Sequence, residues 1–188
     1  MDPTPRCLLL IGASGAGKST QGSLLSNRLG LTHLPVGDIL RAQTRDTLGV
    51  HEGATLPDAL VAEIMKPFVQ KSLAYRGCIL DGFPRSMHGY RALLSSGITI
   101  DIAISLSVDP IERSQRLRAR QAIEPRADDT PQRAAERAII FASQTQLFIE
   151  FLAQQKKLIE IDGNASAEVT ENRIVSYLKG SSIRDLVN

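Results

Sequence analysis

A glycine-rich stretch near the start of the chain, residues 12–20, carries the residue types needed to hold a row of phosphates. It reads GASGAGKST and fits the pattern G-x-x-x-x-G-K-[ST] without a gap. The glycines allow backbone N–H groups to turn toward an anion, and Lys18 is placed to reach the outer phosphates. An apolar run precedes the stretch at residues 7–11, and leucines at helical spacing follow it as far as Leu29 and Gly30. This strand–loop–helix context favours a nucleoside triphosphate site over the alternative, a tight turn with one exposed lysine.

A series of arginines in the second half of the chain is also suited to phosphate chemistry. Their spacing of three and four residues places several of them on one face of each predicted helix. They are Arg113, Arg116 and Arg120, then Arg126 in a polar segment, then Arg133 and Arg137. A solvated basic face is the simpler alternative, because runs of charge usually face water. Like charges this close, with few acids to balance them, fit a phosphate-rich ligand better, since guanidinium groups make bidentate bonds to phosphoryl oxygens.

A second candidate anion site follows the predicted strands at their carboxyl ends, where ligands bind in open parallel sheets. Asp81 and Arg85 follow the strand predicted at residues 77–81, and Arg41 follows an earlier strand and a glycine in the same way. Two anion sites suggest phosphoryl transfer between two nucleotides. A phosphate acceptor is already an anion, so this reaction needs no general base.

The composition fits one domain with a sizeable core, since the chain has 188 residues. Its formal net charge of +2 is too small to indicate binding to nucleic acid or to an acidic membrane. Cys7 and Cys78 each begin an apolar run, so buried free thiols are expected rather than a disulfide. No apolar stretch has membrane-spanning length and the first residues lack an apolar signal region, so we expect a cytoplasmic enzyme.

Strand-like and helix-like segments alternate along the chain. Apolar runs predict five strands, at residues 7–11, 31–36, 77–81, 98–108 and 158–162. After the helix that follows the glycine-rich loop, helices are predicted at residues 39–46, 58–73, 110–121, 130–156 and 167–178. This order predicts an α/β protein with a mainly parallel sheet. Strand 98–108 alternates almost perfectly, which is typical of a half-exposed strand, whereas an α/β fold would bury both of its faces.

Several residues are interpreted as structural. Pro67 is expected to kink or split the helix at residues 58–73. The inner side of the helix at residues 130–156 is expected to comprise Ala138, Ile139, Phe148, Ile149 and Leu152. The histidines have no acidic partner nearby in the sequence and are taken as surface or structural residues; they are His33, His51 and His88.

Taken together, the motifs resemble those of adenylate kinases, one group of the nucleoside monophosphate (NMP) kinases. They are GASGAGKSTQ at residues 12–21, GDILRA at 37–42, DGFPR at 81–85, Arg116 with Arg120, RADD at 126–129, and Arg137. The resemblance implies a P-loop NTPase three-layer fold in one domain, residues 1–188, with a mainly parallel five-stranded sheet flanked by helices. It also implies a shortened NMP-binding flap at about residues 39–73 and a short lid at about residues 121–130. The implied reaction transfers the γ-phosphoryl group of Mg-ATP to an NMP, AMP first, in a monomer without nucleic-acid or membrane partners.

Matching positions carry the family's roles onto this sequence. The resemblance implies that ATP is held by Gly15, Ala16, Gly17, Lys18, Ser19, Thr20, Arg116, Arg120 and Ala165. It implies that the NMP is held by Val36, Arg41, Leu56, Gly82, Phe83, Arg85, Gly89, Arg126 and Arg137. The implied catalytic residues are Lys18, Arg41, Arg85, Arg120, Arg126 and Arg137. Mg²⁺ is implied to lie near Ser19 and Asp81, with water between the ion and Asp81.

The sequence departs from the family pattern mainly at the acceptor base. Val36 and Gly89 replace a threonine and a glutamine with which AMP-binding members read the base, and pyrimidine-specific members do not match these positions either. AMP selectivity is therefore expected to be weak, shifted, or rebuilt from other residues such as His88. Three alternatives stay open: a UMP/CMP-type or broad NMP kinase, a P-loop kinase for a phosphate-poor metabolite, and a nucleotide-binding regulatory protein with impaired catalysis. In the loop, Ser14 and Ser19 replace the family's proline and glycine, and Ser19 places a hydroxyl where it can approach Mg²⁺.

Overall fold

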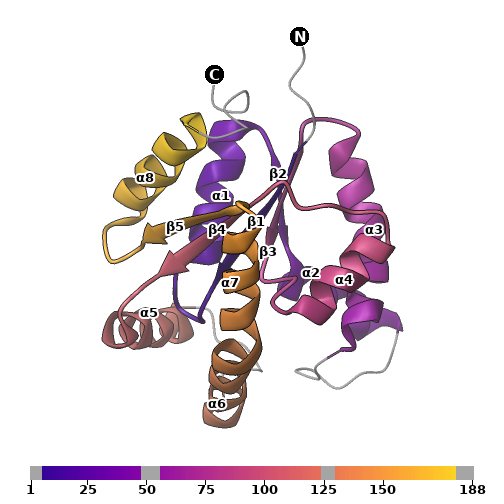
Figure 1. The fold of residues 1–188 in the computed structure, drawn as a ribbon. Coiled ribbons are helices and arrows are strands. Elements are labelled where there is room, and N and C mark those ends of the chain that lie inside the picture. The colour runs from indigo at the N-terminus through magenta and orange to yellow at the C-terminus, as the bar shows by residue number, and fades with distance from the viewer. Residues whose placement is uncertain (1–5, 48–55, 124–129, 181–188) are drawn as a thin grey trace.

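The fold is built on a parallel sheet of five strands, seen in a computed structural model that describes residues 6–47, 56–123 and 130–180 (Figure 1). The strands are β1 (Arg6–Gly12), β2 (Thr32–Pro35), β3 (Gly77–Asp81), β4 (Ile102–Ser107) and β5 (Leu158–Asp162). Their order across the sheet is β2-β3-β1-β4-β5, and every pairing is parallel. The predicted α/β class and mainly parallel sheet are confirmed.

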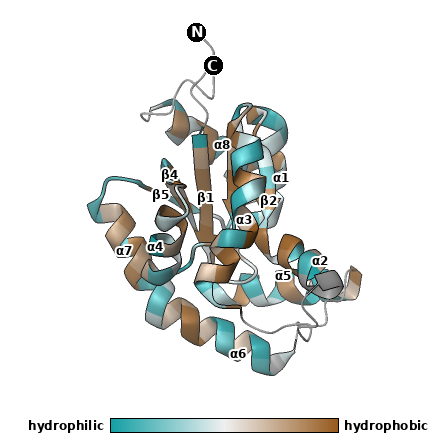
Figure 2. Ribbon diagram, turned by 90° about the vertical axis from the view of Figure 1, so that its right-hand side faces the viewer, coloured by the Kyte–Doolittle hydropathy of each residue, from teal (hydrophilic) through white to brown (hydrophobic). Residues whose placement is uncertain are grey.

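The central strand β1 separates two hydrophobic cores, and Figure 2 shows it as hydrophobic along most of its length. Because successive side chains of a strand point to opposite faces, Cys7, Leu9 and Ile11 belong to one core, and Leu8 and Leu10 belong to the other. In β4 all residues from Ile102 to Leu106 are buried. The alternation of apolar and small polar residues there reflects two covered faces, not one exposed face.

Helices cover both faces of the sheet and give the molecule three layers. Helices α1 (Lys18–Leu29) and α8 (Ala167–Lys179) supply the core that contains Leu8 and Leu10. Helices α3 (Asp58–Leu73), α4 (Met87–Ser95) and α7 (Gln146–Gln154) supply the other core. The remaining helical elements are α2 (Val36–Thr47), α5 (Pro110–Ile123), α6 (Pro131–Ile140) and the π-helical turn η1 (Phe141–Thr145). In Figure 1, α2, α5 and α6 lie in the lower part of the view.

Local signals place most helix ends correctly. Gly30 adopts a left-handed conformation (φ 67°) and ends α1 as predicted. The carboxylate of Asp109 accepts a hydrogen bond from the Ile111 N–H at 2.8 Å, and the hydroxyl of Thr130 accepts one from the Arg133 N–H at 3.3 Å. Helix α2 begins at Val36, earlier than predicted.

Two predictions about helices in the α3–α4 region need correction. Helix α3 continues through Pro67 without a break, so of the predicted kink or split the split is wrong. Helix α4 was absent from the predicted elements, although Ser86 caps it by accepting a hydrogen bond from the Gly89 N–H at 3.0 Å.

The long helix predicted at residues 130–156 is α6, η1 and α7 in succession, and the inserted turn changes which residues face inward. A π-helical turn contains one extra residue, so the helix before it is rotated by about 100° relative to an uninterrupted α-helix. Phe148, Ile149 and Leu152 are buried as predicted, whereas Ala138 and Ile139 are exposed, the latter at 66%. The prediction for Ala138 and Ile139 is therefore wrong. This rotation matters for the site described below, because it turns Arg137 inward.

The two cysteines lie next to each other in the sheet. Cys7 and Cys78 are buried free thiols, as predicted, on paired strands with their sulfur atoms 3.7 Å apart. The hydrogen bond with Cys78, followed by burial, raises the pKa of the Cys7 thiol well above its ordinary value.

Among the helices of the described residues, none combines the length and the apolar character needed to cross a membrane.

Candidate active site

The glycine-rich loop joins the end of β1 to the start of α1, at the carboxyl edge of the sheet. Gly15 (φ 82°) and Gly17 (φ 90°) adopt left-handed backbone conformations that other residues rarely take. At Gly15 a side chain is also excluded by space, because a Cβ atom would lie 2.7 Å from the backbone oxygen of Arg113. The loop is thus shaped by its glycines, and α1 begins directly after it, so its unbonded N–H groups face the loop.

Lys18, the first residue of α1, folds its side chain back over this loop. Its ammonium donates hydrogen bonds to the backbone oxygens of Gly12 (2.9 Å) and Ala13 (3.0 Å). Burial lowers the pKa of Lys18, and the positive charges of Arg120, Arg85 and Arg113 lower it further, while Asp81 opposes the shift. The causes of this shift show that several cations converge on the loop, which is the arrangement that attracts a polyanion.

A carboxylate lies next to the loop and is held by two side chains. The Ser19 hydroxyl donates a hydrogen bond of 2.7 Å to Oδ2 of Asp81, and Nε2 of His33 lies 3.4 Å from the same oxygen. Although burial by itself raises the pKa of Asp81, the hydrogen bonds from His33 and Ser19 and the charge of Lys18 together lower it. Asp81 therefore remains ionised at neutral pH while only 5% exposed.

His33 is a site residue that the sequence interpretation missed. It lies on β2, and Asp81 is 48 positions further along the chain on β3. The strands pair in parallel with Pro35 opposite Asp81, so His33 is two residues away and on the same face of the sheet. Gly22 makes room for the ring, since a Cβ atom there would lie 2.3 Å from Nε2 of His33. Only the strand order could have revealed this contact. His88 is exposed on α4, in agreement with its interpretation as a surface residue, and His51 lies outside the described residues.

Most of the predicted phosphate-binding residues line one cleft of about 620 Å³. Their elements converge there from different parts of the chain: the loop and α1, the start of α2, the end of β3, α5 and α6. The predicted site residues in the lining are Gly15, Gly17, Lys18, Ser19, Thr20, Arg41, Asp81, Gly82, Arg116, Arg120 and Arg137. Arg41 forms an ion pair with Asp38, one turn earlier on α2. The cleft therefore combines five cationic side chains with the single buried carboxylate of Asp81.

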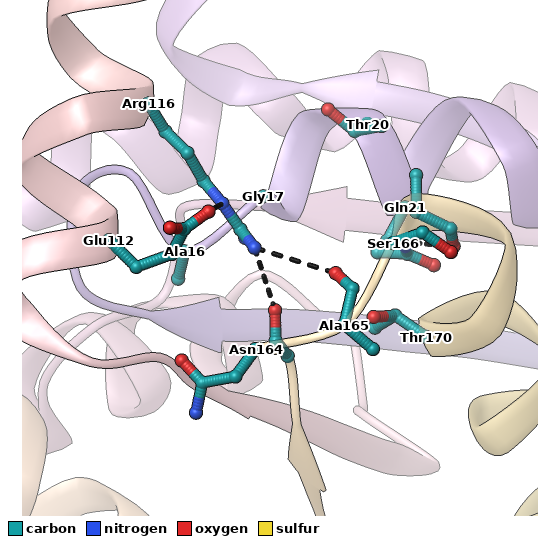
Figure 3. A pocket seen from close by; sticks show the side chains of 12 residues that line it. Ala16, Gly17, Thr20, Gln21, Glu112, Arg116, Asn164, Ala165, Ser166 and Thr170 are labelled. Atoms are coloured by element: carbon teal, nitrogen blue, oxygen red, sulfur yellow. Dashed lines mark hydrogen bonds and ion pairs between the residues drawn. The ribbon is translucent and has the colours of Figure 1, made fainter.

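A second pocket, of about 470 Å³, shares Arg116 with this cleft, and Figure 3 shows the residues that line it. Arg116 crosses it from α5 and donates hydrogen bonds to the backbone oxygens of Gly163 (3.0 Å) and Ala165 (3.5 Å). Its Nε donates to the carboxylate of Glu112 at 2.8 Å, which fixes the plane of the guanidinium. The predicted residues Ala16 and Ala165 lie in this lining, and Gly17, Thr20 and Arg116 line both spaces. A flat guanidinium beside backbone carbonyls provides a stacking surface and hydrogen-bond acceptors for a planar ring.

A smaller cavity of about 180 Å³ contains the remaining predicted arginine of the DGFPR motif. Arg85 lines it together with Lys18, Gly82 and Arg137. The buried Thr145 of η1 also lines this cavity, and its hydroxyl donates a hydrogen bond of 2.9 Å to the backbone oxygen of Arg85. The π-helical turn thus places Arg137 in the cavity and fixes the backbone of Arg85 at the same time. No local sequence signal indicated this role for Thr145.

Two of the arginines singled out by spacing do not point into these spaces. The Nε of Arg113 donates to the backbone oxygen of Val108 at 3.1 Å and so fixes the start of α5. Arg133 pairs with Glu136 at 2.8 Å on the surface of α6. Arg126 lies outside the described residues. Two of the arginines in this series are therefore paired with acids, Arg116 with Glu112 and Arg133 with Glu136, although few balancing acids were expected from the sequence.

The positions predicted to hold an acceptor base are mostly apolar and packed. Val36 and Phe83 are 2% and 4% exposed in the core that contains α3 and α4, and Leu56 packs against that core. Gly89 is buried in the first turn of α4. A Cβ atom on Gly89 would lie 2.9 Å from Cε2 of Phe83, so the phenyl ring occupies the space that a longer side chain needs.

Comparison with known proteins assigns the family. The adenylate kinase family model matches residues 10–157. An adenylate kinase of Cyanothece sp. is 35% identical over 94% of this chain and 98% of its own length, and one of Azobacteroides pseudotrichonymphae is 35% identical over 90% and 95%. An adenylate kinase of Porphyromonas gingivalis is 30% identical over 89% of this chain and 92% of its own. The chain therefore belongs to the adenylate kinase family and is a phosphotransferase of that type.

Proposed function

We propose that this protein transfers the γ-phosphoryl group of Mg-ATP to a nucleoside monophosphate, with AMP as the first candidate acceptor. The observation that carries the proposal is the cleft that Lys18, Arg41, Arg120 and Arg137 line together with the Ser19–Asp81 pair. Catalysis of phosphoryl transfer consists largely of alignment and of neutralising charge on the transferring group. Several cations lining one cleft with the buried carboxylate of Asp81 are suited to both. The relatives' name, adenylate kinase, favours AMP.

The donor half of the site would hold ATP. Backbone N–H groups of the loop and the Lys18 ammonium would bind its phosphates, with Gly15, Ala16, Gly17, Ser19 and Thr20 completing the cradle. The adenine ring would stack on Arg116, with the backbone oxygen of Ala165 at its edge. Arg120 would neutralise charge on the phosphoryl group during transfer.

The residues present fit a magnesium ion. Mg²⁺ takes oxygen ligands in octahedral geometry and keeps several waters. Ser19 offers a hydroxyl oxygen and Asp81 an ionised carboxylate, 2.7 Å from each other at the edge of the phosphate loop. When bound there, Mg²⁺ would neutralise charge on the phosphates of ATP, and His33 would keep Asp81 oriented toward it.

The acceptor half would hold the NMP. Arg41 and Arg85, together with Arg137 and Arg126, would bind the phosphate that accepts the transferred group. An anionic phosphate needs no base to activate it. The base would lie against Val36, Leu56, Gly82, Phe83 and Gly89. The proposal includes a single domain over residues 1–188, with a flap at about 39–73 and a lid at about 121–130 that exclude water on closing.

The direct test is an assay with ATP and a panel of AMP, CMP, UMP and GMP, with and without Mg²⁺. We expect steady ADP formation with at least one NMP, and a loss of about 10²-fold or more when Mg²⁺ is removed by chelation, since the ion's charge stabilisation is lost. No turnover with any NMP would overturn the proposal. Tight ATP binding without turnover, and no gain in affinity for a dinucleoside polyphosphate, would favour the regulatory alternative.

Thr145 provides a test of how the acceptor arginine is held. Thr145→Val keeps the size of the side chain but removes the hydrogen bond to the half-buried backbone of Arg85, at a cost of about 1 kcal/mol. We expect the KM for the NMP to rise by about tenfold while the KM for ATP stays unchanged. Thr145→Ser, which keeps the hydroxyl, should restore the KM of the parent enzyme. Equal changes in both KM values would mean that Thr145 serves general stability and does not position Arg85.

A further inference from the structure

Because Gly89 has no side chain, the carboxylate of Asp58 lies close to its Cα, beside the space that a side chain would fill. A Cβ atom placed on Gly89 would lie 2.9 Å from the ring of Phe83 and 3.2 Å from Oδ2 of Asp58. Phe83 is only 4% exposed, so its ring is confined by the core and cannot move aside without a cost. A side chain at position 89 would therefore have to displace the Phe83 ring, and among the described residues the polar atom nearest to that space is Oδ2 of Asp58.

Asp58 is fixed in this position by a chain of two hydrogen bonds. The Ser86 hydroxyl donates to Oδ2 of Asp58 at 3.0 Å, and the Gly89 N–H donates to the same hydroxyl at 3.0 Å. Asp58 is also the first residue of α3, where the helix dipole favours a negative charge. The contact thus joins the first turn of α3 to the first turn of α4. It leaves Asp58 partly exposed, with further acceptor capacity on its two oxygens.

We propose that Asp58 reads the acceptor base by accepting a hydrogen bond from an exocyclic amino group. The inference rests on the proposed function, which places the base against Val36, Leu56 and Gly89. An ionised carboxylate only accepts hydrogen bonds, so it attracts an amino group and repels a carbonyl oxygen at the same place. The acceptors selected are amino-bearing nucleotides such as AMP and CMP, against partners that lack the amino group. The apolar side chain of Val36 offers no hydrogen bond to the base, so among the described side chains proposed to lie against it the carboxylate of Asp58 carries the preference.

The test compares pairs of nucleotides that differ at this group. AMP is compared with purine riboside 5′-monophosphate, which lacks only the amino group, and CMP is compared with UMP. Dissociation constants are measured by calorimetry, and kcat/KM is measured with ATP as donor. The parent protein should prefer the amino-bearing member of each pair by about tenfold or more, the usual effect of a hydrogen bond to a charged group.

Asp58→Asn keeps the shape of the side chain but allows it to donate as well as accept. In this variant the preference should fall below about threefold in both pairs, with UMP improving because the amide donates to its carbonyl. Glu63→Gln is the matched control, because Glu63 accepts a 3.0 Å hydrogen bond from Ser96 and so joins α3 to the other end of α4. It should leave both ratios unchanged.

The outcomes separate the two proposals. If NMPs are phosphorylated but the parent protein shows no preference within either pair, or if Asp58→Asn weakens both members equally, the role of Asp58 is wrong and the kinase proposal stands. If no NMP is bound or phosphorylated, both proposals are wrong. A preference that collapses in Asp58→Asn and persists in Glu63→Gln supports Asp58.

Discussion

Arg85→Glu is expected to lower the turnover of ATP with an NMP by about 10³-fold or more, while the dissociation constant of ATP changes by less than about twofold. Removing one group that stabilises transition-state charge costs about 10²–10³-fold, and reversing its sign adds repulsion of the acceptor phosphate. Arg85 shares its cavity with Lys18 and Arg137, and none of the described residues that line this cavity also lines the pocket that contains Ala165. Loss of this charge should therefore affect the acceptor and the reaction, and leave ATP bound. Steady-state kinetics together with calorimetric titration of ATP measure the two quantities.

Arg91→Glu is the matched control for this experiment. Arg91 is exposed on α4, six residues beyond Arg85, and the same charge reversal there changes the net charge of the protein equally. It should keep kcat within about twofold, since exposed charges away from special features have small effects. An Arg85→Glu protein that retains a tenth of the parent activity would show that the acceptor phosphate is bound elsewhere. Weakened ATP binding in that variant would show that Arg85 belongs to the donor half.

Lys18→Met should lower kcat/KM for ATP by about 10³-fold. Methionine keeps the length and apolar stem of lysine but has no ammonium to follow the charge on the outer phosphates as transfer proceeds. Arg120, Arg85 and Arg113 lie close enough to lower the pKa of Lys18. A polyphosphate bound at the Lys18 ammonium would therefore also be attracted by these three charges, in a partly buried setting where attraction is stronger than in water. The hydrogen bonds from Lys18 to Gly12 and Ala13 would also be lost.

The interpretation of Lys18→Met depends on an intact fold. Lys71→Met, on the exposed side of α3, removes one positive charge without touching the cleft and should keep the parent activity. Thermal unfolding of all three proteins separates loss of function from loss of structure. If Lys18→Met kept more than one tenth of the parent activity, the glycine-rich loop would not have the proposed role in the reaction.

Local sequence patterns were enough to predict most of the secondary structure. Strands such as β1 and β3 are continuous apolar runs, and caps such as Thr130 and Gly30 act within one helical turn. The loop at residues 12–20 is recognisable for the same reason, because its glycines and lysine are contiguous. The resemblance to adenylate kinases, carried by short motifs, is confirmed by the comparison with known proteins.

Where the structure differs from the sequence prediction, a contact between distant segments or a non-standard helical turn determined which way the side chains face. One π-helical turn rotates α6, so that Arg137 faces the cleft and Ile139 faces water, and no local periodicity contains that rotation. The sequence left the exposure of β4 open, and the fold decides it: β1 and β5 pair with its two edges, and Ile102 to Leu106 are all buried.

Residue type and short-range spacing were enough to predict a phosphate-binding loop and an α/β protein. Which side chains meet depends on the tertiary fold. His33 reaches Asp81 because β2 pairs with β3, and Asp58 reaches the space beside Gly89 because α3 packs on α4. Such contacts depend on strand order and helix packing, which join residues tens of positions apart. The phosphate-binding loop was therefore visible in the sequence, and the proximity of Asp58 to the space beside Gly89 became visible only in the fold.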